Sequence, residues 1–171
     1  MMKVLFAGLV IREALQRISE IGESRQIFNQ SREYADAVGK PLLVVGAPKL
    51  RFNHPCGDVT IDISPDMAKF CNGEVADVRD IPYPDKYFGA AFVSHVLEHL
   101  ATIADASQAL DELERVADRV FTASPHKTSV LAWLNPKHHL WVTPSGDGYI
   151  LEQRGNGASP KTMSYVALEV Y

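Results

Sequence analysis

Two aspartates stand where short apolar stretches of the sequence end. Asp62 closes residues 59–62, about 16 residues after Gly46, and Asp77 closes residues 74–77. A carboxylate at the end of a buried strand can accept hydrogen bonds from two ribose hydroxyls or from an exocyclic amine. Aspartate is also common where a strand simply turns. The spacing favours a nucleoside site, with turn capping as the alternative.

A glycine-containing turn precedes these aspartates. Gly46 and Ala47 follow an apolar stretch at residues 42–45, and Pro48 comes next. Nucleoside cofactors approach the backbone closely at such turns. Proline has no N–H and a fixed φ, so it changes what the turn can offer a ligand. The sequence predicts a backbone contact at Gly46 and Ala47 that Pro48 modifies.

Three residues at the end of another apolar stretch carry imidazole and carboxylate groups. His95, Glu98 and His99 have the H-x-x-E-H spacing of one zinc peptidase class. On a helix, residues four apart share a face, so two imidazoles could reach one metal ion. Because the sequence places no third ligand, we predict that no metal is bound. His95 is instead the candidate general base.

A segment with several histidines, residues 124–144, follows the strand predicted at residues 119–123. We interpret the segment as a surface loop that Trp133 and Trp141 anchor to the core. The alternative is a lid that recognises an acidic or aromatic substrate. In that case His126 or His138 is a second candidate base.

The elements that must position these residues are short strands and one clear helix. Continuous apolar runs that end in glycine or aspartate are typical of parallel strands buried on both faces. Five such strands are predicted, at residues 42–45, 59–62, 74–77, 90–93 and 119–123. A helix is expected over residues 105–117, with Thr102 and Asp105 as its capping box. Two tail segments, 149–153 and 164–170, are expected to be antiparallel strands.

The N-terminal part of the chain has a helical pattern instead. Apolar residues recur at helical spacing over residues 11–38, and we expect Gly22 to divide them into two helices, of which Gly39 ends the second. The pattern as a whole predicts an α/β fold, a Rossmann-like open, mostly parallel sheet with flanking helices and an antiparallel edge, plus N-terminal helices. We expect a helical segment at residues 1–39 and an α/β domain at residues 40–171.

Two stretches of sequence carry a resemblance to a known family. The first is VTIDISPDM, at residues 59–67, and the second is GEVADVRDIPYPDKYFGAAFVSHVLEHL, at residues 73–100. Together they resemble the class I S-adenosylmethionine-dependent methyltransferases, above all the compact members, over about residues 41–123. The resemblance implies S-adenosylmethionine as cofactor and a methyl acceptor that the sequence does not identify.

The resemblance also implies roles for particular residues. Asp62 would bind the ribose, and Ile63 would pack on the adenine. Asp77 would contact the adenine amino group, with the backbone of Val78 at the edge of the ring. These four positions define the nucleoside half of the expected pocket.

The other half of the pocket would lie at Ser94 and His95, which would face the methionine end and the substrate.

The first motif departs from the family, which has an acidic residue two positions before a Gly-x-Gly turn. This sequence has Val44 at the acidic position and Pro48 in place of the second glycine. The main alternative to an enzyme is therefore an inactive, methyltransferase-like structural or interaction subunit.

A third alternative is a binder of another nucleoside ligand, in which Lys49 and Arg51 meet an anionic group. The net charge of the 171 residues is −4, and without a run of basic residues there is no strong nucleic-acid signal.

We interpret Cys56 and Cys71 as reduced residues of a cytoplasmic protein, although a disulfide between them is allowed. The apolar residues 4–11 are too few to span a bilayer. They favour contact with a partner or a membrane surface through the N-terminal helix.

Overall fold

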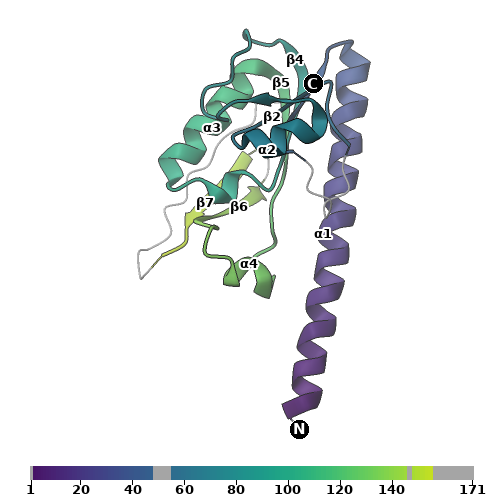
Figure 1. The fold of residues 1–171 in the computed structure, drawn as a ribbon, viewed down its shortest axis with the longest axis vertical. Helices are drawn as coiled ribbons and strands as arrows, with labels where there is room; N and C mark the ends of the chain where they lie inside the picture. The colour runs from purple at the N-terminus through teal and green to yellow at the C-terminus, as the bar shows by residue number, and fades with distance from the viewer. Residues whose placement is uncertain (1, 48–54, 146–147, 156–171) are drawn as a thin grey trace.

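A five-stranded parallel sheet forms the centre of the molecule (Figure 1). The computed structural model describes residues 2–47, 55–145 and 148–155. The strands are β1 (Leu42–Val45), β2 (Val59–Asp62), β3 (Glu74–Val75), β4 (Phe88–Ser94) and β5 (Ala117–Ala123). Their spatial order is β3-β2-β1-β4-β5, and every neighbouring pair is parallel. This topology confirms the predicted open α/β sheet.

The sheet is covered on both faces, which explains its continuous apolar strands. Successive side chains of a strand point to opposite faces, so Leu42 and Leu43 belong to two different core clusters. On one face, Phe28 of helix α1 (Met2–Val38) meets Phe92 edge-on, with 5.5 Å between the ring centroids. The other face packs against helix α3 (Ile103–Val116) through residues such as Leu110.

Helix α1 is one continuous helix of 37 residues, so the expected break near Gly22 is wrong. A glycine inside a helix costs only about 1 kcal/mol relative to alanine, too little to interrupt a helix that its neighbours support. The helix ends at Gly39 as predicted. Gly39 has a φ of +67°, and its N–H donates to the Asp36 carbonyl oxygen at 3.1 Å. In Figure 1 the N-terminal end of α1 extends past the other elements.

Helix α3 begins at the predicted capping box. The Asp105 N–H donates to Thr102 Oγ1, and the Thr102 N–H donates to Asp105 Oδ2, both at 3.1 Å.

Among the described residues, no helix is both long and apolar enough to cross a membrane. The shorter helices are α2 (Pro65–Ala68), η1 (Lys69–Cys71), η2 (Leu97–His99) and α4 (Val130–Leu134).

The antiparallel strands form a small sheet of their own. Strand β7 (Gly148–Gln153) was expected, but it pairs with β6 (Leu140–Ser145), inside the segment that we interpreted as a loop. The reason is the run of Leu140, Trp141 and Val142, whose buried side chains add to the core. The other predicted tail strand, at residues 164–170, lies outside the described residues.

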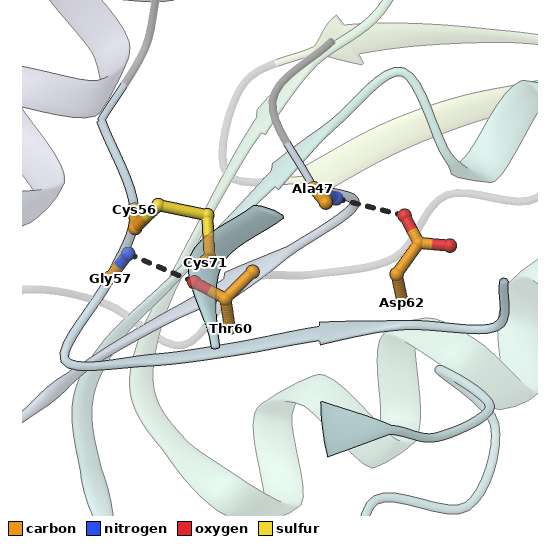
Figure 2. The surroundings of a disulfide bond; sticks show 6 residues. All are labelled: Ala47, Cys56, Gly57, Thr60, Asp62 and Cys71. Atoms are coloured by element: carbon orange, nitrogen blue, oxygen red, sulfur yellow. Dashed lines mark hydrogen bonds between the residues drawn. A yellow bond between two sulfur atoms is a disulfide. The ribbon is translucent and has the colours of Figure 1, made fainter. Parts of the chain in front are cut away.

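A disulfide joins Cys56 to Cys71 (Figure 2). The expectation that both thiols are reduced is therefore wrong. The two residues lie on either side of β2 in the sequence, and the fold brings their Cα atoms to 5.6 Å, a separation typical of disulfides. The bond thus ties the approach to β2 to the short helix η1 that follows it.

Candidate functional site

A cleft of about 830 Å³ lies at the carboxyl ends of β1, β2 and β4. Ligands bind at this edge of an open α/β sheet because the strand ends and the following turns converge there. The residues that the resemblance predicts to hold the cofactor, and the first candidate base, all line the cleft, whereas Pro48, Lys49 and Arg51 lie outside the described residues. Those that line the cleft are Gly46, Ala47, Asp62, Ile63, Asp77, Val78, Ser94 and His95.

Gly46 forms the sharp turn at the end of β1. Its φ is +87°, in the left-handed region that favours glycine. A Cβ at this position would lie 2.6 Å from Val96 Cγ2 and 3.0 Å from the Ser94 carbonyl oxygen. The Gly46 N–H donates to the Ile61 carbonyl oxygen at 3.0 Å. Both the backbone conformation and the space around it therefore require glycine.

Asp62 ties two backbone segments together at the end of β2. Its Oδ2 accepts a hydrogen bond from the Ala47 N–H at 2.9 Å (Figure 2), and its Oδ1 accepts one from the Ser64 N–H at 2.8 Å. The turn-capping interpretation is thus confirmed. Because a carboxylate offers about four acceptor positions, capping does not use up its capacity to bind hydroxyls. The neighbouring Ile63 side chain is 70% exposed at the cleft.

Asp77 is held by Arg79, which the sequence analysis did not single out. The guanidinium donates from Nε to Oδ1 at 3.0 Å and from Nη2 to Oδ2 at 2.7 Å. These hydrogen bonds hold the pKa of Asp77 below its ordinary value, although partial burial opposes them. Arg79 Nη1 also donates to Asp105 Oδ1 at 2.7 Å, which connects the cleft to the cap of α3. The only signal in the sequence was an arginine two residues after an aspartate.

His95 follows β4 in an uncommon backbone conformation, with a φ of +54°. Its N–H donates to the Ala123 carbonyl oxygen at 2.9 Å, and its Nδ1 lies 3.2 Å from Oε1 of the buried Glu98. Beside it, the Ser94 hydroxyl is buried and lies 3.4 Å from the Ser24 hydroxyl of α1. Strained backbone of this kind is concentrated at functional sites.

Part of the cleft lining comes from η2 and from the connection between α4 and β6. His99 and His138 lie there with their ring centroids 4.8 Å apart. Burial lowers the pKa of His138, partly offset by the charge of Glu98. His126, the other candidate base in this part of the sequence, is not among the described residues that line the cleft.

Helix α1 also contributes to the cleft, through Arg17 and Glu20. Glu20 is buried, and its Oε1 accepts a hydrogen bond from the His126 N–H at 3.1 Å. Earlier in the same helix, the Glu13 carboxylate accepts hydrogen bonds from the Val130 N–H at 2.9 Å and from the Leu131 N–H at 3.0 Å. No local pattern could have revealed these contacts, because they join residues more than 100 positions apart.

Comparison with known proteins gives one family for the segment that carries the strand ends. Residues 47–119 match the model of a family described as a methyltransferase domain, which confirms the resemblance predicted from the sequence. No curated protein matches the sequence.

The solved structures that match this chain include three proteins of low sequence identity. N-methyltransferase NodS from Bradyrhizobium japonicum, solved with S-adenosyl-L-homocysteine, is 16% identical with a TM-score of 0.39; the match covers 54% of this chain and 56% of that one. A possible histamine N-methyltransferase from Thermotoga maritima is 16% identical, with a TM-score of 0.35 and coverages of 58% and 53%. A protein from Pyrococcus horikoshii is 18% identical, with a TM-score of 0.41 and coverages of 70% and 66%. This chain thus spans between about half and two thirds of their lengths.

Proposed function

We propose that this chain binds S-adenosylmethionine in the cleft and transfers its methyl group to an acceptor. One observation carries the proposal: residues chosen from separate strands in the sequence line a single cleft at the carboxyl edge of the sheet. The match of residues 47–119 to a methyltransferase domain supports the same function.

The sulfonium of the cofactor supplies an already electrophilic methyl carbon. The work left to the protein is mainly alignment, because attack must come in line with the bond that breaks. Asp62 would accept hydrogen bonds from ribose hydroxyls, and the exposed side chain of Ile63 would pack on the adenine; both residues line the cleft. The acceptor would enter the cleft beside His95.

His95 would take a proton from an acceptor that must lose one. With Nδ1–H donating to Glu98, Nε2 is the nitrogen that would take the proton, and the buried carboxylate orients the ring. This pairing of a histidine with a carboxylate follows the usual logic of general-base catalysis. We expect His95→Gln to lower kcat more than it changes cofactor affinity.

Calorimetric titration with S-adenosylhomocysteine tests the proposal. We expect saturable binding that Asp62→Ala weakens about 10- to 100-fold, because hydrogen bonds to a charged group are worth about 1.5–3 kcal/mol. Asp66→Ala is the matched control, since Asp66 is 92% exposed and pairs with Lys69 at the surface. Absence of binding by the folded wild-type chain would contradict the proposal and favour an inactive, methyltransferase-like subunit.

Two further expectations from the sequence stay predictions. Contact with a partner or a membrane surface through α1 is supported by exposed apolar side chains on its N-terminal half, namely Val10, Ile11, Leu15 and Ile18. The expected cytoplasmic location is weakened by the Cys56–Cys71 disulfide, because such bonds are rare in reducing compartments.

A further inference from the structure

Three side chains that line the cleft bring potential metal ligands together. One ligand atom each from Glu98, His99 and His138 lies within 4.8 Å of the others. Glu98 and His99 belong to η2, whereas His138 comes from the connection that leads into β6. The His139 N–H donates to the Glu98 carbonyl oxygen at 2.7 Å, so the backbone itself holds the two segments together.

Glu98 presents an uncompensated oxygen to this cluster. The residue is only 1% exposed, and its Oε1 faces His95 Nδ1 at 3.2 Å. Its Oε2 is buried and has no hydrogen-bond partner among the described residues. A buried carboxylate without full compensation is costly, so this oxygen calls for a cation or a donor.

The two histidines meet the same point with suitable chemistry. His138 Nδ1 is also buried and has no hydrogen-bond partner among the described residues. His99 Nδ1 lies 2.9 Å from the Lys137 carbonyl oxygen, which can only accept, so Nδ1 carries the proton. Nε2 of His99 is then left with its lone pair. A ligating histidine typically donates its other ring N–H to a backbone carbonyl in this way.

We propose that Glu98, His99 and His138 bind a divalent transition metal of the zinc type. Two imidazoles and one carboxylate are a common zinc donor set, and three protein ligands leave a fourth coordination position open. All three residues line the cleft, so that position would be open to water or to an oxygen or sulfur atom of an acceptor.

The ligand set differs from the one that the H-x-x-E-H spacing suggested. His95 is not part of the cluster. Its Nδ1 contacts Oε1 of Glu98, the carboxylate oxygen that does not face the proposed metal, and thereby orients the Glu98 side chain. The third ligand is His138, which only the folded chain brings close. The rival explanation is a buried water that bridges Glu98 and His138, and this explanation predicts no uptake of metal.

Metal binding can be tested on the full chain without tag or cofactor, so the outcome is independent of the proposed methyl transfer. The chelator-treated, disulfide-intact protein is titrated with Co²⁺ and then with Zn²⁺. We expect one Co²⁺ per chain, with the visible absorption of a four-coordinate ion and loss of the colour on addition of Zn²⁺. Absence of a thiolate-to-cobalt absorption band would exclude Cys56 and Cys71 as ligands. No stoichiometric binding would overturn the proposal.

Variants assign the site. Glu98→Gln, His99→Ala and His138→Ala should each weaken Co²⁺ binding by about 100-fold or more, because removal of a direct ligand exceeds the loss found for its supporting groups. His126→Ala is the matched control, since its Nδ1 contacts Thr128 Oγ1 at 2.9 Å outside the cluster. His99 is exposed, so its variant remains informative if a buried substitution prevents folding. Wild-type affinity in the His99 and Glu98 variants would overturn the assignment.

Discussion

The turn at the end of β1 depends on a single residue, Gly46. We expect Gly46→Ala to lower the free energy of unfolding by about 1–3 kcal/mol, because alanine must adopt a positive φ and its Cβ meets Val96. Denaturant unfolding measures the change.

Gly22→Ala is the matched control for this substitution. A Cβ at Gly22 has nothing within 4 Å, so alanine should stabilise α1 by up to about 1 kcal/mol. Equal effects of the two substitutions would contradict the account of the Gly46 turn.

The ion pairs of Arg79 predict how stability depends on acidity. Hydrogen bonds from Arg79 lower the pKa of Asp77, and hydrogen bonds from Thr102 and Arg79 lower that of Asp105. A carboxyl with a lower pKa in the folded state stabilises the fold above its unfolded pKa of about 4. That contribution is lost as the pH falls through the folded pKa.

Unfolding measured at pH 7 and at about pH 2.5 tests this sign. We expect Arg79→Ala to be less stable than the wild type at pH 7, with the difference shrinking in acid. Lys69→Ala serves as control, because Lys69 and Asp66 are 77% and 92% exposed and contribute little. A difference for Arg79→Ala that does not change with pH would be inconsistent with the proposed ion pairs.

At the scale of elements, α4 depends on a carboxylate from a distant helix. Burial raises the pKa of Glu13, but hydrogen bonds from Leu131, Val130 and Ser129 outweigh it, so that the pKa lies below its ordinary value. Glu13→Ala should destabilise α4 by about 1 kcal/mol, as the loss of a helix cap does. Hydrogen exchange at the Val130 and Leu131 amides measures the effect.

Glu23→Ala is the control for this prediction, since Glu23 contacts only Ser19 of its own helix among the hydrogen bonds described. It should leave exchange in α4 unchanged. Unaltered exchange in Glu13→Ala would show that α4 is held by other contacts.

Local signals predicted the elements whose sequence matches their environment. The bounds of β1 and β2 are as expected, because four apolar residues precede Gly46 and three apolar or β-branched residues precede Asp62. Strand β3 is shorter than predicted, since the Asp80 N–H donates to the Asp77 carbonyl oxygen and turns the chain. Strand β6 was missed because its apolar triad stands among histidines and prolines.

At the scale of the whole molecule, the site divides into a part that the sequence predicts and a part that it does not. Residues at strand ends were found because parallel strands bring their carboxyl ends to one edge. Glu20 was not, because it reaches the cleft through contacts between distant segments, and His138 was named only as an alternative base. The disulfide belongs to this second part, since only the fold determines the 5.6 Å between the Cα atoms of Cys56 and Cys71.

The most direct test of the proposed cofactor site is a crystal structure of the chain with S-adenosylhomocysteine. We predict ribose hydroxyls at hydrogen-bond distance, about 2.6–3.2 Å, from the Asp62 carboxylate. The adenine should lie between Ile63 and the backbone of Val78, with the amino acid end directed toward Ser94. A ligand bound away from these residues, or saturated crystals with no ligand in the cleft, would contradict the account.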